Sequence, residues 1–247
     1  MSARPTRGMV LAAGLGTRMR AVSDTVPKPL VSVGGKPLIA HVLERLERTG
    51  VTGIVVNTHH LAAQIESFLA TFTDRPGAPR IHISHEEERL ETGGGVRRAL
   101  PLLGDDAFYV VNCDVVLAEG GTPALSCLAA AWDGEAMDAL LLVCPLPRTL
   151  GYDSAGDFFR HEDGRLSRRG RAQAAPFVFT GTQILHPRLF VDAPAGAYSL
   201  NRHYDEALLA GRLFGLEHRG HMLHVGSPEG LEAAERYLAA ERRGENG

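Results

Sequence analysis

The sequence predicts an α/β protein, with a Rossmann-like, three-layer sandwich of helices around a mixed, mainly parallel sheet. Two observations predict this fold class. Short apolar runs alternate with amphipathic helical patterns from the first strand to about residue 145, as in βαβ units. The chain has 247 residues, of which 44% are hydrophobic and 22% charged, so it can bury one substantial core. We therefore expect a single domain over residues 1–247.

The chain up to about residue 145 contains five expected strands and four expected helices. The run over residues 10–13 is apolar throughout, as in a strand buried on both faces. A helix is expected over 37–50, because proline favours a first helical turn and glycine a C-terminal cap. The other expected strands cover 53–57, 80–84, 107–111 and 138–143, and the other expected helices cover 61–69, 93–100 and 123–132.

The pattern changes after Pro145. Residues 148–171 are rich in Gly, Asp and Arg, and two short alternating pieces around Phe158 and Leu166 predict a hairpin. We expect this insertion to close over one side of a site at the sheet edge. Regular structure is expected to return with strands over 176–179, 213–217 and 222–225 and helices over 201–210 and 228–242.

Charge and cysteine content narrow the class of protein. The formal net charge of -3 gives no basic field, so neither nucleic acid nor an anionic membrane is expected as a partner. Cys113, Cys127 and Cys144 are odd in number and lie in apolar surroundings without metal-type spacing. They favour free, buried thiols in a reducing compartment, so we expect a cytoplasmic protein. No signal peptide or membrane-spanning run is visible.

Residues 9–30 place an apolar strand, a glycine loop and two cations in direct succession. Gly14 and Gly16 allow the backbone to turn sharply beside a phosphate, and Arg18 and Lys28 supply positive charge. A short glycine loop alone leaves a tight turn with surface cations as an alternative. The flanking prolines fix the backbone of Lys28, which a surface lysine would not need, and they favour the phosphate-site interpretation.

A second polar group follows the expected strand over 107–111. Asn112-Cys113-Asp114 comes at its carboxyl end, and ligands of open α/β sheets bind at that edge. Thr92 is expected to cap a helix that begins in the run Gly93-Gly94-Gly95, whose free N–H groups would face an anion or a polar base edge. Asp114 would then share the sheet edge with the glycine loop.

These motifs resemble the signature of the sugar-1-phosphate nucleotidyltransferases, with Leu11-Ala12-Ala13-Gly14-Leu15-Gly16-Thr17-Arg18-Met19 followed by Pro27-Lys28-Pro29-Leu30. Leu90-Glu91-Thr92-Gly93-Gly94-Gly95, Asn112-Cys113-Asp114, Thr180-Gly181 and Val225-Gly226-Ser227 follow in the family's order. Within the family, the chain most resembles the N-acetylmuramate-1-phosphate uridylyltransferases. The resemblance implies a GT-A-like fold, with a nucleotide-binding half over 1–145 and a sugar-binding half and C-terminal helix over 146–247.

The resemblance also implies a reaction. UMP would pass from UTP to a sugar 1-phosphate, N-acetylmuramate 1-phosphate in the first place, with release of pyrophosphate, in the recycling of cell-wall precursors. No general base is required, because a phosphate monoester has a second pKa of about 6 and is a dianion at neutral pH. Catalytic roles fall on Arg18, Lys28 and Asp114, and Asp114 would hold Mg²⁺, or Mn²⁺ in its place. A turn cap is the alternative role for Asp114.

The resemblance assigns further contacts residue by residue. Nucleotide contacts fall on Leu11, Ala12, Ala13, Gly14, Gly16, Thr17, Glu86, Thr92 and Gly93, and sugar contacts on Asn112, Gly151, Thr180 and Gly181. Glu86 can accept the imide proton of uracil or thymine, which cytosine lacks, but a solvated acidic turn with Glu87 and Glu88 is an open alternative. UTP and a sugar 1-phosphate are the expected partners of a monomer or weak homo-oligomer.

The chain departs from the family pattern at His224. The family commonly has Asp before Val-Gly, where it gives the metal a second carboxylate, but this chain reads Leu223-His224-Val225-Gly226. Imidazole is a poor ligand for Mg²⁺ and carries no negative charge. Three arrangements stay open. Asp114 holds the metal with water and phosphates alone, another carboxylate takes the place of the missing one, or His224 contacts phosphate. Two other functions stay open: a glucose-1-phosphate thymidylyl- or uridylyltransferase, and a nucleotide-sugar-binding protein with reduced catalysis.

Overall fold

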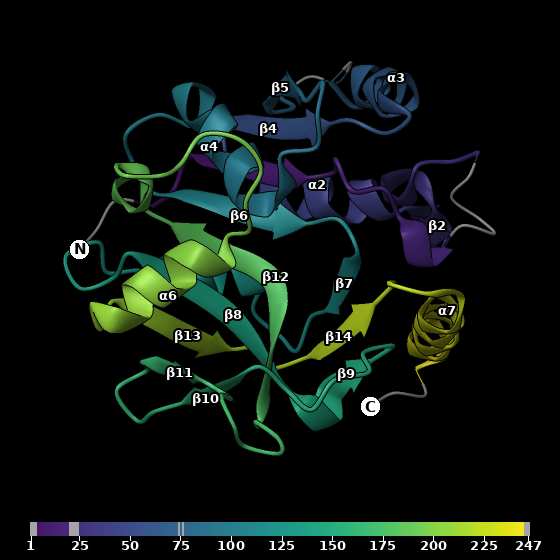
Figure 1. Cartoon of the computed structure of the whole chain (residues 1–247). Helices are drawn as coiled ribbons and strands as arrows, with labels where there is room; N and C mark the ends of the chain where they lie inside the picture. Colours follow the sequence, from purple (N-terminus) through teal and green to yellow (C-terminus); the bar gives the residue numbers. More distant parts are fainter. Residues whose placement is uncertain (1–3, 20–24, 74, 76, 245–247) are drawn as a thin grey trace.

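The computed structural model describes residues 4–19, 25–73, 75 and 77–244, so residues 20–24 of the glycine-loop stretch lie outside it. The main sheet consists of β1 (Arg7–Leu11), β4 (Gly53–Thr58), β5 (Arg80–His85), β6 (Phe108–Asn112), β8 (Ala139–Pro145), β10 (Phe158–Arg160), β11 (Leu166–Arg168), β12 (Phe177–Leu185) and β13 (Leu213–Glu217). These strands form one mixed sheet in the order β11-β10-β12-β6-β1-β4-β5, to which β8 and β13 are added beside β12 (Figure 1).

The sheet has a parallel part and an antiparallel part. β1 pairs in parallel with β4 and β6, and β4 pairs in parallel with β5. β12 runs antiparallel to β6, β8 and β10, while β13 is again parallel to β8. The predicted α/β class with a mixed sheet is therefore confirmed, and β12 is the strand that makes the sheet mixed.

Helices cover both faces of this sheet (Figure 1). They are α2 (Leu38–Arg48), α3 (Ala62–Thr73) and α5 (Ala124–Ala131) on one face, and α4 (Glu91–Leu103) and α6 (Asn201–Leu209) on the other. Alternate residues of each strand supply the two cores: Val10 and Val56 pack toward the first group, and Met9 and Val55 toward the second. β1, β4, β6 and β8 are buried on both faces and are mostly apolar, which is why their sequence pattern is so clear. The edge strand β5 is largely exposed and alternates polar with apolar residues.

A smaller sheet adjoins the carboxyl edge. It consists of β7 (Val115–Ala118), β14 (His221–His224) and β9 (Thr149–Leu150), and α7 (Pro228–Arg243) packs on it. Val116, Leu223 and Ala234 form a third core there, together with Met19 and Val31 from the glycine-loop stretch. The remaining pieces are β2 (Ser32–Val33), β3 (Lys36–Pro37) and the 3-10 turns η1 (Thr17–Met19), η2 (Lys28–Leu30), η3 (Leu146–Arg148) and η4 (Pro187–Phe190).

Several expected bounds differ from those observed. β1 ends at Leu11 and not at residue 13, because the Ala12 N–H donates to the Asn57 side chain at 2.7 Å. The expected strand over 176–179 continues to Leu185, with a shift in its pairing to β8 between Phe179 and Gln183. The strands β2, β3, β7 and β9 are too short to show a period in the sequence.

The insertion over residues 148–171 forms the predicted hairpin from β10 and β11. The expectation that it closes over the site is wrong for the cavity described below. The hairpin pairs through Phe158 with Phe177, the first residue of β12, and no residue of 148–171 lines the cavity. The insertion approaches the site only through Gly151 and Tyr152, which contact His224.

All three cysteines are free, as predicted. Cys113 and Cys144 are buried, and burial raises the pKa of the Cys144 thiol to about 11, whereas Cys127 is only half-buried. Within the part of the chain that the structure describes, no helix is both long and apolar enough to cross a membrane.

The packing of α2 on the sheet gives a stability prediction. Leu46 is fully buried in the first core, so Leu46→Ala should lower the free energy of unfolding by about 2–5 kcal/mol through lost burial and a residual cavity. Leu209→Ala, at the end of α6, is the matched control, because that side chain is 91% exposed, and it should change stability by less than about 0.5 kcal/mol. Urea unfolding followed by circular dichroism measures both. Equal losses would contradict this account of the core.

Candidate active site

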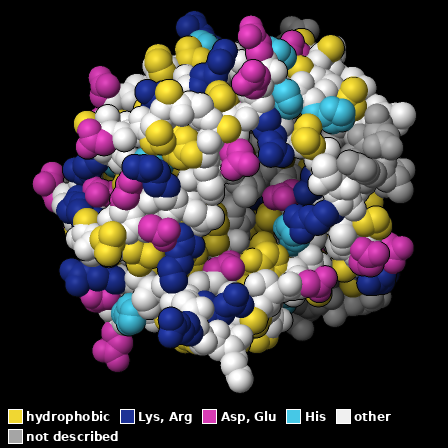
Figure 2. Space-filling model, in the orientation of Figure 1, with side chains coloured by type: hydrophobic (Ala, Val, Ile, Leu, Met, Phe, Trp, Pro, Cys, Tyr) yellow, Lys and Arg dark blue, Asp and Glu magenta, His cyan; other side chains and the backbone are white. Residues whose placement is uncertain are grey.

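A cavity of about 400 Å³ opens at the carboxyl ends of β1, β4 and β6. Figure 2 shows this face of the molecule hollowed, with basic and acidic side chains around the hollow. Twelve residues that the sequence assigned to the site line the cavity, namely Leu11, Ala12, Ala13, Gly14, Gly16, Thr17, Arg18, Lys28, Glu86, Thr92, Asn112 and Asp114. Residues up to 103 positions apart therefore meet at one edge of the sheet, as ligand sites of open α/β sheets do.

The glycine loop turns from β1 into η1. Gly16 has a φ of +63°, which favours glycine, and its carbonyl accepts the Met19 N–H at 2.8 Å. Gly14 differs, because its φ is not in the left-handed region and no described atom lies within 4 Å of where a Cβ would stand. The protein itself does not require glycine at position 14. The open space beside it suits a ligand that approaches the backbone closely.

A hydrogen-bonded chain joins the start of this loop to α4. Asn57, at the end of β4, accepts the Ala12 N–H through Oδ1 and donates through Nδ2 to Glu86 Oε1, both at 2.7 Å. Glu86 Oε2 in turn accepts the Leu90 N–H at 2.9 Å. Glu86 is only 1% exposed, so the alternative of a solvated acidic turn is wrong for this residue. Its carboxylate already holds two donors, although its remaining lone pairs can accept another.

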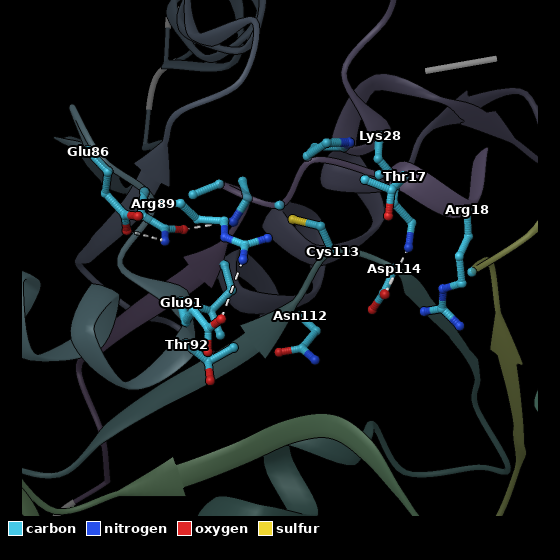
Figure 3. Close-up of a pocket in the computed structure, with 18 of the residues that line it drawn as sticks. Thr17, Arg18, Lys28, Glu86, Arg89, Glu91, Thr92, Asn112, Cys113 and Asp114 are labelled. Carbon is cyan, nitrogen blue, oxygen red and sulfur yellow. Dashed lines mark hydrogen bonds and ion pairs between the residues drawn. The ribbon is translucent and has the colours of Figure 1, made fainter. Parts of the chain in front are cut away.

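Lys28 and Asp114 form an ion pair on the opposite side of the cavity (Figure 3). Lys28 Nζ lies 2.9 Å from Asp114 Oδ2, and η2 holds the lysine through the Leu30 N–H, which donates to the Pro27 carbonyl. His224 Nε2 lies 3.7 Å from the same oxygen. Burial alone would raise the pKa of Asp114, but the neighbouring His224 and the Lys28 ammonium outweigh it and hold the pKa of this carboxyl well below its usual range.

The register of the small sheet brings His224 to this point. His224 pairs with Val115 across β14 and β7, and the Val225 N–H donates to the Asp114 carbonyl at 2.8 Å. Arg18 lines the cavity on the same side as Lys28 and Asp114 in Figure 3, whereas Glu86, Arg89, Glu91 and Thr92 lie on the other side. Lys28 and Arg18 therefore lie at one end of the cavity, whereas Arg89, at the other end, pairs with Glu91.

The donor set at Asp114 fits a hard divalent cation in one particular mode. The described residues contain no group of three His, Cys, Asp or Glu side chains able to hold a metal by themselves. Mg²⁺, however, is usually held by one or two carboxylates together with water and substrate phosphates. Both partners of Asp114 contact Oδ2, so within the described residues Oδ1 has no hydrogen-bond partner, and the side chain is 27% exposed. Asp114 lines the cavity and keeps carboxylate lone pairs available to an ion, as this mode requires.

Thr92 does not cap α4, and the N–H groups of the glycine run are not available to a ligand. α4 begins at Glu91, so Thr92 does not cap it; the Thr92 hydroxyl instead accepts the Leu200 N–H at 2.9 Å, just before α6. The N–H groups of Gly93 and Gly94 are not free, because both donate to the Tyr198 carbonyl. Gly93 does not line the cavity, and a Cβ there would lie 2.4 Å from the Tyr198 ring. The glycine run is needed for close packing.

Three of the four expected sugar contacts also lie outside the cavity lining. The Thr180 side chain is fully buried and donates to the Leu142 carbonyl at 3.0 Å, so it turns into the sheet. A Cβ at Gly181 would lie 2.8 Å from Asn112, so this glycine leaves room for the one sugar candidate that does line the cavity. Gly151 supports His224 through its carbonyl.

Sequence reasoning did not assign seven lining residues, namely Pro29, Asn57, Arg89, Glu91, Cys113, Ser199 and Gly226. Asn57 had a usable signal, because it ends a predicted parallel strand. Glu91 stands in the quoted motif over residues 90–95 without an assigned contact; it has a φ of +57°, rare for a residue with a side chain, and pairs with Arg89 at 3.4 Å. Ser199 comes from a connection more than 80 residues after Asp114, and only the tertiary structure brings it here.

An α/β sheet with a glycine loop, two cations and one carboxylate at its carboxyl edge defines a site for phosphate groups, as in nucleotidyltransferases. The chain belongs to the MobA-like NTP transferase family, whose domain model matches residues 8–243. The predicted resemblance to sugar-1-phosphate nucleotidyltransferases is thereby confirmed.

Individual relatives agree with this assignment. The chain is 41% identical over 240 residues to the N-acetylmuramate alpha-1-phosphate uridylyltransferase of Caulobacter vibrioides, covering 97% of this chain and 99% of the relative. It is 34% identical over 238 residues to the protein of the same name from Neisseria meningitidis serogroup B, covering 95% and 99%. A solved structure of UDP-glucose pyrophosphorylase complexed with UDP-glucose has the same fold, with a TM-score of 0.79, 17% identity, and 95% and 98% coverage.

The Ala12–Asn57–Glu86 chain gives a second prediction. Asn57→Leu would leave the buried Ala12 N–H and a Glu86 carboxylate oxygen without their partners, so the free energy of unfolding should fall by about 2–6 kcal/mol. Urea unfolding measures this loss. A variant as stable as the unmodified chain would show that this hydrogen-bonded chain does not hold the loop.

Proposed function

We propose that this chain transfers UMP from UTP to N-acetylmuramate α-1-phosphate and releases pyrophosphate. The observation that carries the proposal is the Lys28–Asp114 pair, which faces the cavity beside the glycine loop and Arg18. Relatives that are 41% and 34% identical over nearly their whole length bear the name of this activity. We extend the proposal to a role in recycling cell-wall precursors in the cytoplasm, which the three free thiols favour.

The reaction requires the negative charges of the two substrates to be neutralised and their reacting phosphates to be aligned. An oxygen of the sugar 1-phosphate attacks the α-phosphorus of UTP, the bond from that phosphorus to the β-phosphate oxygen breaks, and pyrophosphate leaves with the electron pair. The attacking group is already ionised at neutral pH, so no side chain has to remove a proton. Lys28 neutralises the two phosphates that meet at the α-phosphorus, and Arg18 the departing pyrophosphate.

Asp114 would hold a divalent cation through its carboxylate group. When bound, that ion, Mg²⁺ or Mn²⁺, neutralises charge on the triphosphate. The carboxylate itself keeps Lys28 in place and stays ionised near neutral pH, because its pKa is held below the usual range.

Two lining residues are proposed to contact the uracil base and the sugar. Glu86 is proposed to accept the imide proton of uracil, since it lines the cavity at the end away from Lys28. Asn112 is proposed to contact the sugar, with Gly181 leaving room for its side chain. In this proposal residues 1–145 bind the nucleotide, residues 146–247 complete the sugar side, and the single-domain chain acts as a monomer or weak homo-oligomer.

A panel assay tests the proposal. The full chain is incubated with UTP, dTTP, CTP or GTP and with N-acetylmuramate, N-acetylglucosamine or glucose 1-phosphate, with Mg²⁺ or Mn²⁺, and released pyrophosphate is measured. UTP with N-acetylmuramate 1-phosphate should give the highest kcat/KM. A preference for glucose 1-phosphate would favour the alternative thymidylyl- or uridylyltransferase, and release of pyrophosphate from no pair would contradict the proposal.

One observation favours a second candidate, a nucleotide-sugar-binding protein with reduced catalysis. His224 stands where relatives commonly supply a carboxylate, and it lies 3.7 Å from Asp114. Calorimetry that detects UDP-sugar binding without turnover, together with turnover that emerges in His224→Asp, would support this candidate over the first.

Lys28 provides the sharpest single substitution. Lys28→Met should lower kcat by about 10²- to 10³-fold, because the ammonium that opposes the repulsion between the phosphates is lost. Lys36→Met is the matched control, since Lys36 lies on the small β2–β3 ribbon, pairs with Glu44 and does not line the cavity. Steady-state kinetics with saturating UTP measure both variants. Equal kcat values for the two variants would remove Lys28 from the catalytic machinery.

A further inference from the structure

The two nitrogens of the His224 ring face different groups. Nδ1 lies 2.9 Å from the Gly151 carbonyl oxygen, which can only accept a hydrogen bond, so Nδ1 carries a hydrogen. An ion would therefore have to bind at Nε2, in place of the hydrogen that this nitrogen can donate to Asp114. That nitrogen faces Asp114 Oδ2 at 3.7 Å.

The ring is fixed from several sides. The Tyr152 ring meets it edge-on, with centroids 5.5 Å apart and planes at 80°. A Cβ at Gly226 would lie 2.2 Å from His224 Cε1, so a larger residue there would displace the ring. The side chain is only 12% exposed, while Asp114 and Gly226 beside it line the cavity. A histidine that donates one N–H to a carbonyl and presents the other nitrogen in a fixed direction has the arrangement found in metal-binding histidines.

The separation between His224 Nε2 and Asp114 Oδ2 also fits two ligands of one ion. With bonds of about 2.1 Å, ligands at a right angle are about 3.0 Å apart and opposite ligands about 4.2 Å apart. The observed 3.7 Å lies between these limits, so an ion could bridge both atoms without a large movement of either strand. Lys28, the present partner of Oδ2, is a flexible side chain that can turn toward a phosphate instead.

We propose that His224 Nε2 and an Asp114 carboxylate oxygen form a mixed nitrogen–oxygen site that makes this enzyme select Mn²⁺ over Mg²⁺, compared with a site made of two carboxylates. Imidazole nitrogen suits transition-metal ions, and Mg²⁺ strongly prefers oxygen. His224 is thus a determinant of ion specificity. The inference rests on the proposed function only for the presence of a divalent ion.

The test identifies the type of protein atom that is bonded to the ion. Mn²⁺ is added to the full apo chain, alone and with inorganic pyrophosphate, and electron spin echo envelope modulation detects nitrogen bonded to the ion. The unmodified chain should show ¹⁴N modulation, and His224→Asp should lose it. Competition titrations should show that the ratio of Mn²⁺ to Mg²⁺ affinity falls by about tenfold or more in His224→Asp.

Two further variants keep the result interpretable. His221→Asp makes the same change three residues earlier on β14, where the ring contacts Tyr237, and it should retain the ¹⁴N modulation. If His224→Asp fails to fold by circular dichroism, His224→Gln replaces it, because the glutamine side chain can also donate to the Gly151 carbonyl. Absence of ¹⁴N modulation in the unmodified chain, or its persistence in the folded His224 variant, would overturn the inference.

This test is separate from the test of activity. A chain that shows ¹⁴N modulation but releases no pyrophosphate in the substrate panel would refute the proposed function and leave the ion site standing. A chain that turns over UTP without nitrogen bonded to Mn²⁺ would refute the ion site and leave the proposed function standing.

Discussion

The ion pair between Lys28 and Asp114 is the interaction on which the site depends. It joins the segment after the glycine loop to the end of β6, 86 positions later, and it lies where the main sheet and the small sheet meet. Lys28 has only 13% of its side chain exposed, so each charge of the pair stabilises the other. Loss of one partner would leave a poorly solvated charge, which is costly. The pair therefore holds its cation and its carboxylate at the positions proposed for phosphate and metal.

The register of the strands around this pair determines which side chains lie next to Asp114. Asp114 is the last residue before β7, and the pairing of β7 with β14 places His224 opposite Val115. A shift of one residue in that pairing would turn the His224 side chain to the other face of the sheet. The third core, in which Val116 and Leu223 pack with Met19 and Val31, holds this register and the glycine-loop stretch together. Packing in that core thus controls the geometry of the charged groups.

The sequence predicted most of the fold, because β1, β4, β6 and β8 are buried on both faces and stand out as apolar runs. It also located Lys28 and Asp114, whose strand-end and proline-flanked positions carry local signals. It misjudged Thr92 and Gly93, because a threonine before a glycine run reads as a helix cap, and only the tertiary structure shows that Leu200 and Tyr198 use these groups. It could not find Ser199, whose place depends on a long connection.

The position of β12 between β6 and β8 has a consequence for the way the chain is made. The sequence pattern changes after Pro145, which suggests a boundary there. The edge of β6 that faces β12, however, is paired by residues 177–185, which come later in the chain. While the chain leaves the ribosome, that edge and the apolar side chains beside it stay open until β12 has been synthesised. An open strand edge invites pairing with other chains, so a fragment that stops near residue 145 is expected to aggregate. Residues 1–145 and 146–247 therefore complete one sheet together.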